Sequence, residues 1–143
     1  MNHWSGLAVA AVFIWLGMVL AISFLEAPLK FRAPGVTIPI GLGIGRLVFR
    51  ALNVCEVLLA ATALAAVVLG RPPVGAVVAL GVAVAALGAQ VVGVRPALTR
   101  RSDAVLADAA AAQSGRSRSH LVYVGLEAVK VMALVAGGIL LLA

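Results

Sequence analysis

The chain is poor in charged, cysteine and histidine residues, and each shortage excludes a class of protein. Charged residues make up only 11% of its 143 residues and hydrophobic ones 64%, whereas a soluble domain is about half apolar and about a quarter charged. Water is therefore not the solvent for most of its surface. The single cysteine, Cys55, excludes an internal disulfide and a multi-cysteine zinc site. Two histidines argue against a dedicated transition-metal site, and no cofactor is expected.

Four apolar stretches are long enough to cross a bilayer as helices. They cover residues 4–25, 47–70, 74–94 and 120–143. An α-helix rises about 1.5 Å per residue, so about 20 residues cross a hydrocarbon core of about 30 Å. The first stretch is too long, and too poor in N-terminal Lys and Arg, for an ordinary signal peptide. The sequence therefore predicts an all-α fold, in which residues 1–143 form a single integral membrane domain built as a four-helix transmembrane bundle.

Proline and glycine separate these stretches. Residues 28–45 hold three prolines and four glycines and are predicted to form a linker. The prolines at 72–73 predict a tight turn, and Arg95-Pro96 is expected to end the third span. In the long loop that follows, residues 102–113 have the Ala-rich composition of a short interfacial helix, with Ser102 as its N-cap.

Basic residues are distributed unevenly between the two sides of the predicted bundle. The first and third loops share one side, and with their edges they hold nine: Lys30, Arg32, Arg46, Arg50, Arg95, Arg100, Arg101, Arg116 and Arg118. The opposite side holds only Arg71. Because cytoplasmic loops are enriched in Lys and Arg, both termini are predicted to lie outside, in a multi-pass protein of the cell inner (plasma) membrane. This bias accounts for the net charge of +6 without a nucleic-acid partner.

Ionisable side chains also occur within the predicted spans and at their edges. Such groups are costly in lipid and usually face the bundle interior, where they find partners. Three acids and three bases are of this kind: Glu26, Arg46, Arg50, Glu56, Glu127 and Lys130. Their equal numbers favour mutual pairing.

Two helical faces carry most of the polar residues. Arg46, Arg50, Asn53 and Glu56 share one face of the second span, and His120, Tyr123, Glu127 and Lys130 share one face of the fourth. Glu56 and Lys130 each lie about 15 Å along their helices from the first residue of the face, so they are predicted to pair near the bilayer middle. Glu127 must then pair with Arg50 or hold a proton. The other half of the bundle is expected to be dry.

Each polar residue also has a purely structural interpretation. Buried pairs can fix helix register without chemistry, and this alternative stays open beside a binding or transport role. Arg46, Lys30 and Arg32 lie near the interface, where they can reach lipid phosphates. His120 is expected to be interfacial, and Tyr123 to pack with its hydroxyl hydrogen-bonded.

The third predicted span carries two rows of small residues at helical spacing. These are Gly75, Ala79 and Ala83 in one row and Gly81, Ala85 and Ala89 in the other. Such rows allow close helix contact, within a bundle or between copies. The expected partners are therefore the lipid bilayer and either further copies of the chain or other subunits of a membrane complex.

Two short motifs carry a family resemblance. Phe24-Leu-Glu-Ala-Pro-Leu-Lys-Phe31, with Gly45-Arg-Leu-Val-Phe49 opening the next span, resembles bacterial four-helix membrane proteins related to the transmembrane protein 205-like domain family. Those proteins also place an Ala-Pro and a nearby Phe at the end of the first span. The resemblance implies the four-span fold, and the family supplies no established mechanism. Glu56, Glu127 and Lys130 do not map onto its pattern, so it implies no role for them.

Two functions are consistent with these features. The leading hypothesis is a small transport or channel-like protein, whose polar cluster binds or relays a proton or small ion. Four spans are few for a pathway, so this hypothesis favours a homo-oligomer. The alternative is a non-catalytic accessory subunit of a larger membrane complex. An enzyme is not expected, because no nucleophile with its base and no metal-ligand set is apparent in the sequence.

The basic-residue bias makes a direct prediction about orientation. A reporter active only in the cytoplasm should give signal when fused at Ser114 and none when fused at Ala143, because the loop holding Ser114 is among the most basic segments. The reverse pattern would show that the chain sits the other way round.

Overall fold

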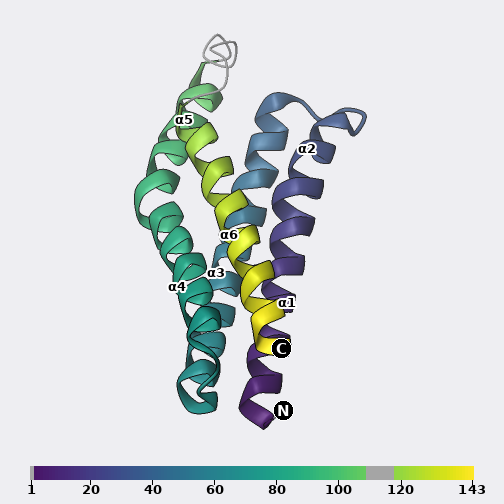
Figure 1. The fold of residues 1–143 in the computed structure, drawn as a ribbon. Coiled ribbons are helices and arrows are strands. Elements are labelled where there is room, and N and C mark those ends of the chain that lie inside the picture. Colours follow the sequence, from purple (N-terminus) through teal and green to yellow (C-terminus); the bar gives the residue numbers. More distant parts are fainter. Residues whose placement is uncertain (1, 109–117) are drawn as a thin grey trace.

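The computed structural model describes residues 2–108 and 118–143, which are almost entirely helical and contain no strand. Four helices, α1 (His3–Val19), α3 (Ile38–Gly70), α4 (Val74–Gly88) and α6 (Arg118–Leu142), form an elongated bundle (Figure 1). Short α2 (Ala27–Leu29) continues α1, and α5 (Arg95–Ala107) continues α4. With these continuations, four helices are long and apolar enough to cross a membrane. The prediction of an all-α bundle with four such helices is confirmed.

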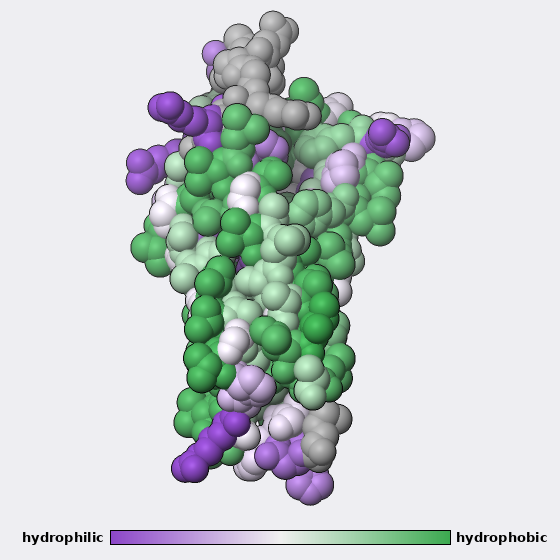
Figure 2. Space-filling view, viewed as in Figure 1, coloured by the Kyte–Doolittle hydropathy of each residue, from purple (hydrophilic) through white to green (hydrophobic). Residues whose placement is uncertain are grey.

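Successive long helices run in opposite directions, so the N- and C-terminal residues lie together at one end of the bundle (Figure 1). We call this the terminal end; the opposite end, where residues 33–37 connect α2 to α3, is the loop end. Hydrophobic residues cover the middle of the visible face, and hydrophilic ones gather at both ends (Figure 2). A chain that spans a bilayer requires this distribution.

The predicted linker over residues 28–45 is wrong for most of its length. Helix α3 begins at Ile38, because the Thr37 side chain accepts a hydrogen bond from the Ile40 N–H (3.5 Å) and Pro39 fits the first turn. Glycines in this part of α3 serve helix packing. A Cβ at Gly45 would lie 2.8 Å from Lys30 Nζ, and one at Gly41 would overlap the Phe31 ring.

The third helix does not end at Arg95-Pro96 as predicted, since residues Val74–Ala107 form one helix. Residues Ala89–Val94 are π-helical, and the Arg95 N–H bonds to the Gln90 carbonyl five residues back. Pro96 then occupies the first turn of α5, where its missing N–H is tolerated. Ser102 therefore lies inside α5 and is not an N-cap. The predicted end of that helix at Gln113 lies outside the described residues, and its interfacial position stays a prediction.

A hydrophobic core fills the terminal half of the bundle. It is built mainly from small and branched side chains of all four long helices, including Ala8, Val12, Ala63, Val67, Leu80, Ala83 and Leu134. The core reaches the level of the buried ionisable residues, because it includes Trp15, which bonds to Glu56, and Val19 one turn farther along α1. The expected dry half is thus apolar, but the core also extends beside the polar residues.

The glycines of α3 allow a paired stability test. Gly41→Ala should lower the unfolding free energy by about 1–3 kcal/mol, because the added methyl overlaps the Phe31 ring. Gly43→Ala meets nothing within 4 Å and should be neutral or stabilising, since alanine is the better helix former. Thermal unfolding of both variants in the same detergent measures the difference; equal melting temperatures would contradict the packing role of Gly41.

Candidate functional site

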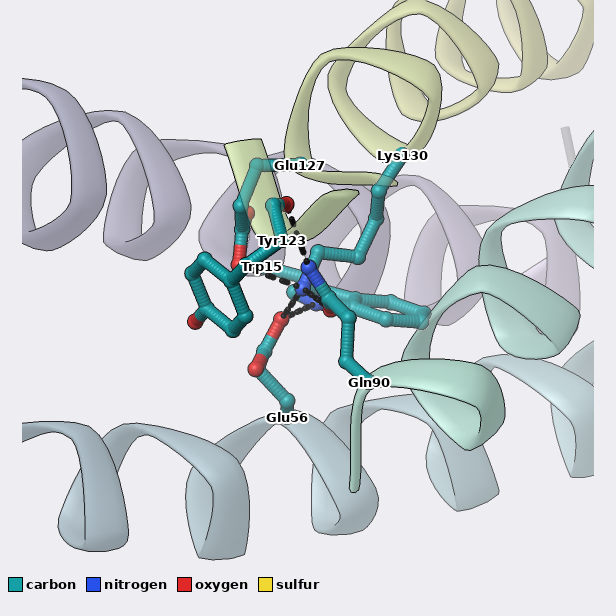
Figure 3. Close-up of polar contacts among 6 residues, drawn as sticks. All are labelled: Trp15, Glu56, Gln90, Tyr123, Glu127 and Lys130. Atoms are coloured by element: carbon teal, nitrogen blue, oxygen red, sulfur yellow. Dashed lines mark hydrogen bonds and ion pairs between the residues drawn. The ribbon is translucent and has the colours of Figure 1, made fainter. Parts of the chain in front are cut away.

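Lys130 is the centre of a buried polar cluster that joins the four long helical segments (Figure 3). Its Nζ lies 2.5 Å from Glu56 Oε1 of α3 and 3.2 Å from Glu127 Oε1, one turn earlier on α6. Lys130 and Glu56 are 0% exposed and Glu127 is 1% exposed, so water contributes almost nothing to their solvation. The predicted Glu56–Lys130 pair is thus present, and Glu127 shares the same cation.

Two further residues complete the cluster, and sequence reasoning did not place them there. Trp15 of α1 donates from Nε1 to Glu56 Oε1 (2.9 Å). Gln90 accepts a hydrogen bond from Lys130 Nζ through Oε1 (2.8 Å) and donates through Nε2 to the Tyr123 carbonyl (3.5 Å). The signals were available, because a tryptophan N–H inside a bundle needs an acceptor and Gln90 is the most polar residue of its span.

The contacts leave the cluster one positive charge short. Lys130 faces two carboxylates, so with both ionised the buried group carries a net negative charge. Glu56 contacts Trp15 and Lys130 through Oε1, and Glu127 contacts Lys130 through its own Oε1. The two carboxyl groups therefore share one ammonium group.

Arg95 also lies near the cluster, but among the described residues it forms no ion pair with Glu56 or Glu127. With the Asn53 amide oriented to satisfy both of its neighbours, Asn53 accepts from Arg95 Nη1 (2.8 Å) and donates to the Phe49 carbonyl (3.1 Å). Among the described residues, Arg95 makes no ion pair with a carboxylate. Asn53 thus belongs to the polar region as predicted, but its partner Arg95 was expected to end a span.

A cavity of about 660 Å³ lies above the cluster toward the loop end. Its walls come from the segment that continues α1 (residues 23–31), the first part of α3, α5 and the start of α6. Three of the chain's four phenylalanines (Phe24, Phe31 and Phe49) and its only tyrosine, Tyr123, line it. Polar side chains also line it, including Lys30, Arg46, Arg95, Thr99, His120 and Glu127. The cavity therefore combines an apolar wall with several cations.

Two buried side-chain oxygens have no hydrogen-bond partner within the described residues, Ser23 Oγ and Glu127 Oε2. Both residues line the cavity. An orphaned buried polar atom costs about 1–3 kcal/mol, so native proteins keep few of them. Their shared location indicates that the cavity is the place where a missing polar partner belongs.

Ion pairs nearer the loop end differ from the predicted arrangement. Glu26 was expected beside the cations of the second span, but it pairs with Lys30 one turn later (3.3 Å). Lys30 is largely buried and lies over the Phe49 ring at 5.4 Å, so it does not extend outward as an interfacial lysine would. Arg46 pairs with Asp103 of α5 (2.5 Å). The neutral set of three acids and three bases is therefore wrong as a pairing scheme.

The remaining predicted site residues lie at the edge of the cluster or outside it. Arg50 is exposed and makes no ion pair with Glu127 or any other described residue. Arg32 is exposed near the loop end, where a lipid contact stays a prediction. His120 is exposed overall and lines the cavity, whereas Tyr123 is buried between the cavity and the cluster.

Two π-helical turns flank this region, Leu20–Glu26 before α2 and Ala89–Val94 before α5. The first includes Ser23, and the second links Gln90 of the cluster to Arg95 of the cavity. Residues five apart in an α-helix face different sides, but the wider turn lets both side chains serve one polar region. Such turns recur at functional sites.

No family model, curated protein or solved structure matches the chain.

Because two carboxyl groups share Lys130, replacing the lysine and replacing one carboxyl group should lower stability by different amounts. Lys130→Met leaves two buried carboxylates without a counterion and should lower the unfolding free energy by on the order of 3–5 kcal/mol. The loss should shrink at acidic pH, where protonation neutralises both groups. Glu56→Gln should cost less, because Glu127 still faces Lys130. Thermal unfolding in detergent across pH compares the variants, and a larger loss in Glu56→Gln would contradict the shared-cation arrangement.

Proposed function

We propose that the protein is a small membrane transport protein whose buried cluster holds an exchangeable proton on Glu127. The observation that carries this proposal is the position of Glu127. Its Oε1 lies against the Lys130 ammonium, while its buried Oε2 has no partner among the described residues and the side chain lines the cavity. A carboxyl group with one side on a fixed charge and the other toward a cavity is suited to take up and release a proton.

The cluster and the cavity have different roles in such a site. Glu56, Trp15 and Gln90 hold Lys130 in place, so the electrostatic surroundings of Glu127 are fixed. The cavity gives a route from the loop end to Glu127, and the hydrophobic core closes the route toward the terminal end. Transport across the whole bundle then requires a second conformation that opens the terminal half.

Membrane placement and assembly are part of the proposal. The basic bias supports a cytoplasmic loop end and the inner (plasma) membrane as location. In the row Gly75, Ala79 and Ala83, Ala83 is buried and the other two contact α6 at Leu140 and Gly137. The row Gly81, Ala85 and Ala89 lies exposed on α4 and is suited to close approach of a second copy.

The accessory-subunit function remains the second candidate, since that exposed row accepts a foreign helix as readily as a copy. Purification in mild detergent separates the two. A homo-oligomer supports transport by the chain itself, and stable co-purification with other membrane subunits supports the accessory role.

The proton on Glu127 can be observed directly. Infrared spectra should contain the carbonyl band of a protonated carboxylic acid at neutral pH, shifted in deuterated water and lost in Glu127→Gln. Glu56→Gln should lose it as well, because Glu127 is then the one carboxylate left to balance Lys130. In proteoliposomes with an internal pH dye, Glu127→Gln should abolish proton flux while its melting temperature stays close to that of the wild type. Amide and protonated carboxyl have similar size and hydrogen-bonding capacity, which is why folding should survive.

Asp108→Asn serves as the matched control, because Asp108 is an exposed acid at the end of α5, away from the cluster. It should keep both the band and the flux. A proton flux, or a carboxylic-acid band, that persists in Glu127→Gln would overturn the assignment of the proton to Glu127.

A further inference from the structure

The donors around the cavity have more positive charge and more hydrogen-bonding capacity than the described residues use. Arg95 lines the cavity, and among the described residues it bonds to the Asn53 amide and to no carboxylate. The other cavity cations differ, because Lys30 pairs with Glu26 and Arg46 with Asp103. Ser23 adds a buried hydroxyl without a partner. Arg95 and Ser23 together therefore lack an acceptor, preferably a negatively charged one.

We propose that the cavity binds an amphiphilic organic anion, with Arg95 binding its carboxylate or phosphate group and the phenylalanine-lined wall holding its apolar body. The guanidinium presents several donors in one plane and matches such groups better than an ammonium does. Phe24, Phe31 and Phe49 supply the apolar wall. The volume of about 660 Å³ lies within the ~300–1,000 Å³ of small-molecule sites, which are mostly apolar with a few polar anchors.

The anion and the proton of Glu127 belong together electrostatically. With Glu127 protonated, Glu56 and Lys130 neutralise each other, Arg95 is the uncompensated charge, and Glu127 Oε2 becomes a donor facing the cavity. With Glu127 ionised, its charge repels an anion at the same site. Binding of the anion therefore takes up a proton. This coupling rests on the proposed function, whereas the Arg95 site does not.

The titratable and charged groups around Glu127 define the controls. Glu56 faces it from α3, Arg95 from α5, and Tyr123 and Lys130 from α6. The first helix contributes Trp15 at this depth, and its Glu26 and Lys30 pair with each other nearer the loop end. His120 also lines the cavity, and because histidine is the side chain whose charge most often changes near neutral pH, it is the main competing source of pH dependence.

Calorimetric titration of the protein in phosphatidylcholine nanodiscs, with empty nanodiscs subtracted, tests the anion site. The probe is decanesulfonate, which stays anionic at every pH used; decanol and decyltrimethylammonium are the neutral and cationic comparisons. Arg95→Gln should weaken decanesulfonate binding by at least about tenfold, and Arg95→Lys should restore part of it. Arg50→Gln, a charge loss of the same kind on an exposed arginine, should leave binding unchanged.

The pH dependence tests the coupling. Wild-type affinity for decanesulfonate should rise as pH falls, Glu127→Gln should bind tightly at every pH, and His120→Gln should keep the wild-type dependence. A pH dependence removed by His120→Gln instead would overturn the coupling. Equal binding of decanol, or no effect of Arg95→Gln in a variant of unchanged melting temperature, would overturn the anion site and leave the infrared test of Glu127 untouched.

The source of the natural anion is resolved by competition. If phosphatidylglycerol in the nanodisc displaces decanesulfonate, the anion is a lipid that enters from the bilayer. If only a soluble competitor such as free decanoate displaces it, the anion reaches the cavity from water. Either result supports the site.

Discussion

Lys130 places an ammonium group where no water reaches it, and each long helical segment of the bundle supplies a group that makes this tolerable. Helix α3 provides Glu56, α6 provides Glu127, the third helix provides Gln90, and α1 provides Trp15, which holds Glu56. The rest of the interface consists of Ala, Val and Leu side chains that pack almost equally well in several registers. A slip of one turn moves a helix by about 5.4 Å and would break these bonds. The polar cluster therefore sets the register of the bundle.

The same cluster divides the bundle into two halves of different character. Toward the terminal end, small side chains allow the helices to approach closely and leave no polar group to satisfy. Toward the loop end, the two π-helical turns and the larger Phe and Arg side chains leave a cavity. An interior cation at the boundary thus faces hydrocarbon on one side and a polar cavity on the other. A site that exchanges a proton or ligand with only one side of a membrane needs this asymmetry.

The sequence predicts the helices and one central contact, and it misses the features that depend on tertiary packing. Hydrophobic length identified the four spanning helices, and equal depth along two helices predicted the Glu56–Lys130 pair. Gly41 and Gly45 lie in a segment whose composition is typical of a linker. Only the structure shows that they are helical and leave space for the side chains of Phe31 and Lys30. Proline usually ends a helix. The π-helical turn before Pro96 places it in the first turn of α5, so the helix continues.

The cluster itself shows the same limit. Helical spacing on a single helix cannot tell which cation faces which acid, so the partners of Glu26 and Arg46, which are Lys30 and Asp103, were not predicted. The indole N–H of Trp15 and the amide of Gln90 carry no charge, and a search for charged residues passes over them. Their importance follows from burial, which the sequence does not supply residue by residue.

The Glu127–Lys130 contact lies within a single helix, three residues apart, and this has a consequence for biogenesis. Helix α6 is synthesised after α1, α3 and α4, and Lys130 enters the bilayer with Glu127 as a counterion on the same helix. By then Glu56 has a donor as well, because Trp15 and Glu56 belong to α1 and α3, which contact each other directly. The Trp15–Glu56 and Glu127–Lys130 contacts can therefore each form before α6 packs against α1 and α3. Assembly of the finished site is then the docking of two surfaces, in which Lys130 of α6 supplies the counterion that Glu56 still lacks.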